Sequence, residues 1–191
     1  IVTIDKTSEK LLSIAIPLLV NSSLIVVPSE YFKNIVLNKI PGIVSEQLLV
    51  SASGGVDKNV FTHLDGYRGL TGTIVYVSRI DTGKGWDILI DAVSELRSRG
   101  KIIGKRVLFV GYGTQTELLE KKIKELDLLE YCSYLGPKTH QEINELYNQA
   151  DVMIFPTMLY ESLGLVGLEA MACGCPVIGS NICCLPEYVK D

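Results

Sequence analysis

The stretch TIVYVSRIDTGKGWDILIDAVSELRSRG, residues 73–100, decides the fold class. Residues 73–78 are mostly β-branched or apolar, which predicts a buried strand. Apolar residues then recur at helical spacing over 86–99, and Gly100 provides a stop for that helix. A strand joined by a short loop to a helix is half of a βαβ unit, so the stretch predicts an α/β domain with a parallel sheet.

The same alternation continues to the end of the chain. We expect further strands at 107–111, 132–136, 152–156 and 176–180, separated by helices at 116–126, 140–150 and 165–173. Short connections between elements of this kind are typical of a Rossmann-like, doubly wound parallel sheet with helices on both faces.

The first part of the chain has a different pattern. Residues 24–29 and 30–40 predict another strand–helix pair. The apolar stretch 11–27 contains Pro17 and three adjacent polar residues, so it predicts a helix and then a strand rather than a membrane span. We therefore expect the tail of a preceding α/β domain at 1–46, an interdomain connection at 47–72, and most of a second, Rossmann-like domain at 73–191 that is truncated at its C-terminus.

The composition excludes several classes of protein. Hydrophobic residues make up 47% and charged residues 21%, and the net charge is −4. An acidic chain has no electrostatic footprint for nucleic acid or an anionic membrane. The five cysteines lack paired metal-ligand spacing, and the two histidines are distant from them. We expect buried, reduced thiols in a cytoplasmic protein, and no metal site.

Two loops that follow predicted strands carry candidate phosphate-binding residues. In SRIDTGKG (78–85), Arg79 and Lys84 lie on a glycine-containing loop, which suits a diphosphate; the alternative is an ordinary solvated loop. In VGYGTQTE (110–117), Gly111 and Gly113 resemble part of a dinucleotide fingerprint. Thr116 stands where the third glycine would be, so a tight turn is the favoured interpretation there.

A third loop leads into the predicted helix at 165–173. Gly164 lets the backbone approach a ligand closely, and the N–H groups of the first helical turn attract an anion. Glu161 and Glu169 flank this turn, and carboxylates are suited to accepting hydrogen bonds from sugar diols. Together they predict a sugar nucleotide; the alternatives are a helix-stabilising role for Glu169 and a solvated Glu161.

SRIDTGKG, FPTMLYESLGLVGLEAMACGCPVI and LPEYV together resemble the donor-binding domain of retaining glycosyltransferases of the GT-B fold, family 4. The spacing from Glu161 to Glu169 is similar to that family's E-x7-E signature. The resemblance is strongest over 73–189, and GGVD (54–57) and VVPSEYFKNIV (26–36) extend it. It implies transfer of a sugar from a nucleotide-diphosphate sugar (UDP, GDP or ADP) to an acceptor hydroxyl, with no cofactor and no essential metal.

The resemblance also implies a role for each candidate residue. Arg79 and Lys84 would neutralise the diphosphate, and Glu161 would hold hydroxyls of the donor sugar. Glu169 would bind the ribose. Backbone groups would supply the remaining contacts, to sugar and phosphate and to the base; they belong to Gly164, Leu165 and Val166, to Gly111 and Gly113 in the loop after 107–111, and to Leu135.

Two departures from the family pattern qualify these expectations. Cys183 and Cys184 stand where relatives usually have two glycines before the final P-E. Most of the acceptor-side domain is absent, so we expect weak donor binding and no transfer by this chain alone. The acceptor (sugar, lipid or protein) is not specified by these residues, and membrane association of the intact enzyme is compatible with them.

Three other interpretations remain. A starch- or sucrose-synthase-like enzyme shares much of the motif, whereas a 2-epimerase fits the E-x7-E pair less well. A non-catalytic nucleotide-sugar-binding module would have the same donor residues. A nicotinamide-dependent oxidoreductase would rest on VGYGTQ alone, which lacks the full glycine fingerprint.

Overall fold

The computed structural model describes residues 9–52, 55–66, 71–159 and 161–190, and the chain forms two compact units. The first unit comprises 1–55, 160–164 and 181–191, and the second comprises 56–159 and 165–180.

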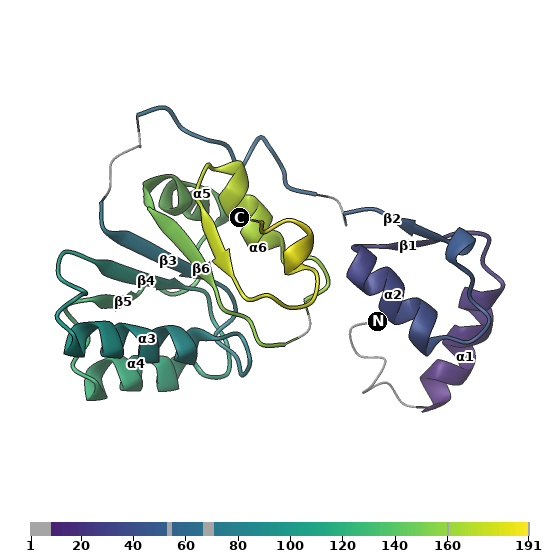
Figure 1. The fold of residues 1–191 in the computed structure, drawn as a ribbon, viewed down its shortest axis with the longest axis horizontal. Coiled ribbons are helices and arrows are strands. Elements are labelled where there is room, and N and C mark those ends of the chain that lie inside the picture. The colour runs from purple at the N-terminus through teal and green to yellow at the C-terminus, as the bar shows by residue number, and fades with distance from the viewer. Residues whose placement is uncertain (1–8, 53–54, 67–70, 160, 191) are drawn as a thin grey trace. The chain divides into compact units, whose positions relative to one another are not determined.

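Within the described residues, the second unit contains a five-stranded parallel sheet. Its strands are β3 (Thr73–Val77), β4 (Arg106–Val110), β5 (Cys132–Tyr134), β6 (Val152–Phe155) and β7 (Val177–Gly179). The helices are α3 (Trp86–Ser98), α4 (Thr116–Glu125), α5 (His140–Gln149) and α6 (Leu165–Ala172). Helices α3 and α4 cover one face of the sheet and α5 and α6 the other (Figure 1), which confirms the predicted doubly wound fold.

The strand order β5-β4-β3-β6-β7 creates a topological switch point. From β3 the chain proceeds outward to β4 and β5, and it then returns to the other side of β3 to form β6 and β7. The loops that follow β3 and β6 therefore lead to helices on opposite faces of the sheet. In open parallel sheets, ligands bind outside the carboxyl ends of the strands at such a point.

The core of the second unit explains the apolar runs of its strands. Large buried side chains pack between the sheet and the α3–α4 layer, among them Tyr76, Trp86, Ile90, Phe109 and Leu119. Residues of opposite parity on the strands, such as Val75 and Phe155, are also buried. Strands buried on both faces lack polar alternation, which is why these segments read as continuous apolar runs.

Residues 62–64, which precede β3, are hydrogen-bonded to two side-chain amides of α5. The N–H groups of Thr62 and Leu64 donate to Asn144 Oδ1 (3.0 Å) and Asn148 Oδ1 (2.7 Å), respectively. Asn148 Nδ2 in turn donates to the carbonyl of Thr62 at 2.9 Å. Both asparagines are buried, and Phe61 packs against the ring of Tyr147. The two amides supply the hydrogen bonds that a neighbouring strand would otherwise supply.

The first unit contains a small βαβ arrangement. Strand β1 (Ile25–Val27) pairs in parallel with β2 (Leu48–Val50), and α2 (Glu30–Lys39) connects them through a short 3-10 turn (Ser45–Gln47). Helix α1 (Glu9–Val20) precedes β1, as expected for the stretch around Pro17. No helix in the described parts of the chain is long and apolar enough to cross a membrane.

Strand β2 falls within residues 47–72, where the sequence predicts a connection. The apolar run Leu48–Val50 is short and is followed by serines and glycines, so its pattern resembles a loop. Pairing with β1 and burial of Leu48 in the first unit's core, beside Val27, Phe32 and Val36, make it a strand.

The cysteines behave as small apolar side chains. All five lie in described segments and none forms a disulfide. Burial raises the pKa of the Cys132 and Cys175 thiols to about 12 and that of Cys173 to about 11. These thiols are therefore protonated at neutral pH, which fits a packing role.

We expect Glu142→Gln to remove a pH-dependent stabilisation of α5. Glu142 and Thr139 form a capping box, in which the carboxylate accepts from the backbone N–H of Thr139 (2.8 Å) and pairs with Lys138 (3.0 Å). The Thr139 and Lys138 hydrogen bonds lower the pKa of Glu142 to about 2. A depressed pKa stabilises the fold above the unfolded-state value of about 4.3, and this contribution disappears as pH falls towards 2. Urea unfolding at pH 7, 4 and 2.5 measures it.

The matched control is Glu145→Gln, three residues along the same helix and exposed. The variant at Glu142 should be less stable than this control at pH 7, and the two should converge at low pH. A constant difference across the pH range would contradict the assignment.

Candidate active site

A buried tyrosine forms hydrogen bonds to the backbone of the β3–α3 loop, residues 78–85. The hydroxyl of Tyr76 donates to the carbonyls of Arg79 (3.3 Å) and Lys84 (3.1 Å). Tyr76 is almost completely buried in β3. Because both carbonyls are tied to one hydroxyl, the backbone on which the two predicted phosphate-binding cations stand is fixed at both ends of the loop.

Two glycines bring this loop against the loop that follows β6. Gly85 has φ +77°, and a Cβ there would lie 1.9 Å from the carbonyl oxygen of Pro156. Gly83 has φ +76°, and its carbonyl accepts from the N–H of Met158 at 2.8 Å. Lys84 lies between these glycines and is half-buried. The loops of β3 and β6 thus meet at the switch point, with Lys84 at their junction.

The β4–α4 loop approaches the same region equally closely. A Cβ at Gly111 would lie 1.9 Å from the Ser78 carbonyl oxygen, and one at Gly113 would lie 2.3 Å from that of Ile80. The hydroxyl of Thr116 accepts from the N–H of Gly113 at 3.1 Å. These contacts account for the two glycines and the threonine as parts of a tight turn against the β3–α3 loop. Their role in donor binding stays a prediction.

Asp81 joins the two loops electrostatically. Its carboxylate accepts from the backbone N–H of Thr114 (2.8 Å) and from its hydroxyl (2.9 Å), and it pairs with Arg79 at 3.0 Å. The Thr114 hydrogen bonds, followed by the charges of Arg79 and Lys84, lower the pKa of Asp81. The Arg79 side chain is 71% exposed, so Asp81 orients the guanidinium while leaving much of it accessible to a ligand.

The loop after β5 lies at the same carboxyl edge of the sheet. The N–H of Leu135 donates to the Phe109 carbonyl at 2.9 Å, and the Gly111 N–H donates to the Gly136 carbonyl at 3.0 Å. The hydroxyl of Tyr134 donates to the carbonyl of Gly111 at 2.8 Å. Leu135 and Gly111, both predicted to lie near the nucleotide base, are therefore on neighbouring, hydrogen-bonded segments.

Helix α6 carries three further predicted residues. Leu165 is exposed and Val166 is half-buried in the first turn, and the Val166 carbonyl accepts from the buried Tyr147 hydroxyl at 3.0 Å. Glu169 lies one turn further along and is half-buried. Burial raises the pKa of Glu169, and the nearby charge of His140 lowers it. A carboxylate with this surrounding is incompletely solvated, so hydrogen-bond donors from a ligand would stabilise its ionised form.

Glu161 and Gly164 belong to the first unit. Glu161 is half-buried, and Gly164 is buried with φ +71°. The opposition of Glu161 and Glu169 across one diphosphate stays a prediction.

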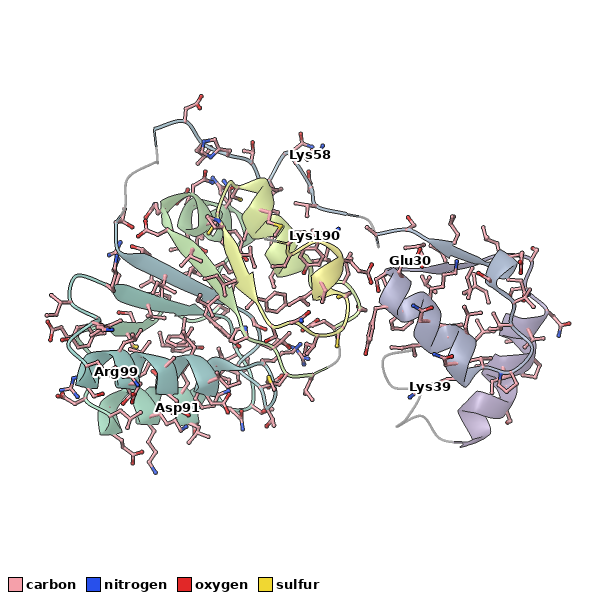
Figure 2. All side chains as sticks on the ribbon, viewed as in Figure 1. Glu30, Lys39, Lys58, Asp91, Arg99 and Lys190 are labelled. Atoms are coloured by element: carbon pink, nitrogen blue, oxygen red, sulfur yellow. The ribbon has the colours of Figure 1, made fainter. Side chains whose placement is uncertain are left out.

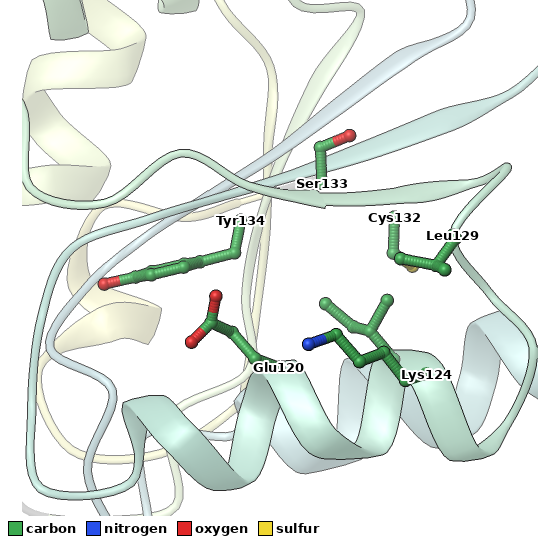
Figure 3. Close-up of a pocket in the computed structure, with 7 residues that line it drawn as sticks. Glu120, Lys124, Leu129, Cys132, Ser133 and Tyr134 are labelled. Carbon is green, nitrogen blue, oxygen red and sulfur yellow. The ribbon is translucent and has the colours of Figure 1, made fainter.

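A pocket of about 280 Å³ lies elsewhere on the second unit, between α4 and the edge strand β5. Figure 3 shows Glu120 projecting from α4 towards Tyr134, whereas the Ser133 hydroxyl points away from the helix. It contains none of the predicted site residues. The cations and glycines gather instead at the switch point, where we therefore place the candidate site.

A comparison with known families gives this geometry a context. The family model described as Glycosyl transferases group 1 matches residues 70–191. The chain belongs to the glycosyl transferases group 1 family. The matched residues include the β3–α3 loop, the β4–α4 loop and α6, so all the candidate residues lie in the family's shared region.

Curated relatives and solved structures agree with this membership. The chain is 33% identical over 150 residues to a D-inositol 3-phosphate glycosyltransferase of Mycobacteroides abscessus, a match that covers 72% of this chain and 32% of the relative. A similar enzyme of Mycolicibacterium smegmatis is 33% identical, with 72% and 33% covered. The chain thus spans about a third of the length of the curated relatives it matches.

Among solved structures, Anabaena HepE in complex with UDP and glucose has a TM-score of 0.81 at 22% identity, covering 100% of this chain and 53% of that one. Sucrose-phosphate synthase from Thermosynechococcus elongatus has a TM-score of 0.77 at 25% identity, covering 97% and 47%. The fold therefore matches that of GT-B glycosyltransferases.

The sequence did not predict a role for Tyr76, Asp81 or Tyr147. Asp81 lies inside the SRIDTGKG motif, where an acid between two cations is a signal for local pairing. Tyr76 and Tyr147 lie within a strand and a helix, where only their hydroxyls distinguish them from other core residues. A buried tyrosine hydroxyl usually finds a partner, and both find a carbonyl near the site.

We expect Gly85→Ala to destabilise the protein far more than Gly100→Ala. Both glycines flank α3 with positive φ. At either position, a Cβ in this left-handed region lowers the free energy of unfolding by about 1–2 kcal/mol. Only at Gly85 does that Cβ also meet a backbone oxygen, whereas nothing lies within 4 Å of it at Gly100. We expect a loss of about 3 kcal/mol or more at Gly85, since overpacking adds about 1–3 kcal/mol. Equilibrium denaturant unfolding measures both; equal losses would disprove the close approach to Pro156.

We expect Glu169→Gln to raise the melting temperature at pH 7. Because burial raises the pKa of Glu169 in the folded state, folding favours its protonated form. The contribution of Glu169 to the free energy of unfolding is therefore greatest below its unfolded-state pKa. It declines as pH rises through the folded-state pKa. The gain from the variant should shrink between pH 7 and pH 4. Thermal unfolding measures it, with the exposed Glu145→Gln as control; a lowered melting temperature at pH 7 would refute the prediction.

Proposed function

We propose that this chain is the donor-binding part of a glycosyltransferase that moves a sugar from a nucleotide-diphosphate sugar to an acceptor hydroxyl with retention of configuration. The observation that carries the proposal is the position of Arg79 and Lys84. Both stand on the β3–α3 loop at the topological switch point, within the region matched by the family.

Arg79 and Lys84 would bind the diphosphate in complementary ways. The planar guanidinium of Arg79 can form two parallel hydrogen bonds to phosphate oxygens, and the Lys84 ammonium acts as a compact charge. The hydrogen bonds of Tyr76 to both carbonyls, and the Asp81–Arg79 pair, hold these groups before any ligand arrives. Groups that are already in place do not have to be ordered on binding, which favours affinity.

Glu169 would accept hydrogen bonds from the ribose hydroxyls. A half-buried carboxylate has lost part of its hydration, and a diol restores two hydrogen bonds to it. Glu161 would bind the hydroxyls of the donor sugar. The backbone N–H groups of Gly164, Leu165 and Val166 would contact sugar and phosphate, because the first turn of a helix leaves N–H groups without intrahelical partners.

The same residues would stabilise the reaction's leaving group. As the glycosyl–phosphate bond breaks, negative charge develops on the departing diphosphate, and fixed cations and the positive end of α6 stabilise it. Retention would follow from front-face attack, with the leaving phosphate taking the acceptor's proton. We propose no metal requirement, since the sequence contains no D-x-D motif.

UDP is the nucleotide that we propose first. The solved complexes of HepE contain UDP or UDP-glucose, and that chain shares this fold. Because the chain spans about a third of its curated relatives, we propose that it binds donor but needs further polypeptide for transfer. The acceptor, and any membrane association of the intact enzyme, would depend on that polypeptide. The buried thiols are compatible with a reducing, cytoplasmic environment.

Titration calorimetry with UDP, GDP, ADP and their glucose conjugates tests the proposal. We expect one nucleotide to bind selectively, and we expect Arg79→Ala and Glu169→Ala each to weaken it about tenfold or more, since hydrogen bonds to charged groups contribute about 1.5–3 kcal/mol.

Arg99→Ala is the matched control for charge. Arg99 lies beyond the end of α3 (Figure 2), pairs with Glu95, and is 61% exposed. Its removal should leave affinity unchanged. Binding that Arg79→Ala and Arg99→Ala weaken equally would show only a nonspecific charge effect, and absence of any nucleotide binding would disprove a donor site in this chain.

A further inference from the structure

In the first unit, Ser29 connects the start of α2 to the segment that carries Glu161. Ser29 is the N-cap of α2, and its hydroxyl oxygen accepts from the N–H of Phe32 at 3.1 Å. The same hydroxyl donates its proton to the carbonyl of Ser162 at 2.8 Å. Ser29 is almost fully buried, so this single hydroxyl both caps the helix and holds a peptide group 133 residues away.

Glu187 completes the cap from the C-terminal LPEYV segment. Its carboxylate accepts from the backbone N–H groups of Glu30 (3.1 Å) and Tyr31 (2.7 Å) in the first turn of α2. Glu30 marks this helix end in Figure 2. Carboxylates are favoured at helix N-termini because the N–H groups there lack intrahelical partners and the helix dipole is positive. Glu187 thereby ties its own segment, a 3-10 turn at Leu185–Glu187, to α2.

Tyr188 connects that turn back to the Glu161 segment. Its hydroxyl donates to the carbonyl of Gly164 at 2.9 Å. Burial, followed by the charges of Cys184 and Glu161, raises the pKa of Tyr188, so the phenol remains a donor at neutral pH. Segment 161–164 is therefore held at two carbonyls, one from α2 and one from the C-terminal turn, and Glu187 joins these two supports.

The two carbonyls are significant because of the N–H groups that share their peptide planes. A peptide group is planar, so fixing the direction of a C=O also fixes that of the following N–H. Tyr188 thus orients the N–H of Leu165, one of the groups that would contact the donor. Gly164 has φ +71° and no Cβ, so its backbone has more accessible conformations than that of other residues, and a hydrogen bond to its carbonyl selects one of them.

We propose that Ser29, Glu187 and Tyr188 are positioning residues that hold segment 161–164 in its donor-binding conformation, so that the P-S-E turn (28–30) and the P-E-Y segment (186–188) serve the donor sugar without touching it. The inference rests on the proposed function for the identity of the ligand. It assigns to LPEYV and to the start of α2 a shared role that neither the E-x7-E pair nor the β3–α3 loop accounts for.

Amide hydrogen exchange of this chain without ligand tests the contacts directly. We expect Ser29→Ala and Tyr188→Phe each to speed exchange across 161–165 about fivefold, the effect of losing one hydrogen bond of about 1 kcal/mol. Ser29→Thr keeps the hydroxyl and should restore the wild-type rate. The control is Ser22→Ala, which removes another serine-to-carbonyl bond of the same unit (to Leu18, 2.7 Å) and should leave 161–165 unaffected. Faster exchange confined to α2 would overturn the proposal, because it would show a helix cap and nothing more.

Ligand selectivity provides the second readout. Calorimetry with UDP and UDP-glucose should show that Tyr188→Phe, Ser29→Ala and Glu187→Gln weaken UDP-glucose about fivefold more than UDP, because Arg79, Lys84 and Glu169 still hold the nucleotide. Equal losses for both ligands, or none, would overturn the positioning role. If the wild-type chain binds neither ligand, the proposed function fails, whereas the exchange pattern still decides whether these side chains hold 161–164.

Discussion

The close approach of backbone to backbone at the carboxyl edge of the sheet is the constraint on which the second unit depends. At Gly85 and Gly111 a Cβ would lie 1.9 Å from a carbonyl oxygen of the neighbouring loop, and at Gly113 it would lie 2.3 Å away. Three loops can therefore converge only because these residues carry no side chain. Convergence in turn brings Arg79, Lys84 and Asp81 together and leaves the hydroxyl of Tyr76 within reach of two loop carbonyls.

This constraint changes the meaning of the glycine pattern. Gly111 and Gly113 resemble a fragment of a dinucleotide fingerprint, yet each is explained by the chain segment of 78–80 that lies against it. The hydroxyl of Thr116 accepts the hydrogen bond of the Gly113 N–H, so a threonine in place of the third glycine gives a different kind of turn. A glycine in a loop can serve a ligand or a neighbouring loop, and the sequence alone does not distinguish them, because both require the same absence of a side chain.

Much of the fold was predictable, since strand–helix alternation with buried apolar runs leaves few alternatives to a doubly wound sheet. The cations of the β3–α3 loop were predictable as well, because they follow a strand that any parallel sheet must bury. The supports of the site were not. Tyr76 and Tyr147 look like core residues. Ser29 and Glu187 act through contacts that span more than a hundred residues of sequence, and Tyr188 acts through one that spans 24. Strand β2 was missed because its pairing partner, not its own three residues, determines it.

The hydrogen bonds between residues 62–64 and two asparagine side chains affect how this segment can detach. An ordinary sheet edge would hold a strand by a row of independent backbone bonds, which can be lost one at a time. Here Asn144 and Asn148, one helical turn apart on α5, supply the bonds together, and Asn148 also donates to the Asn144 side chain. These hydrogen bonds are therefore cooperative. If the turn of α5 that carries both asparagines unfolds, residues 62–64 lose all of them together. The hydrogen bonds of residues 62–64 thus depend on one turn of α5 rather than on a neighbouring strand.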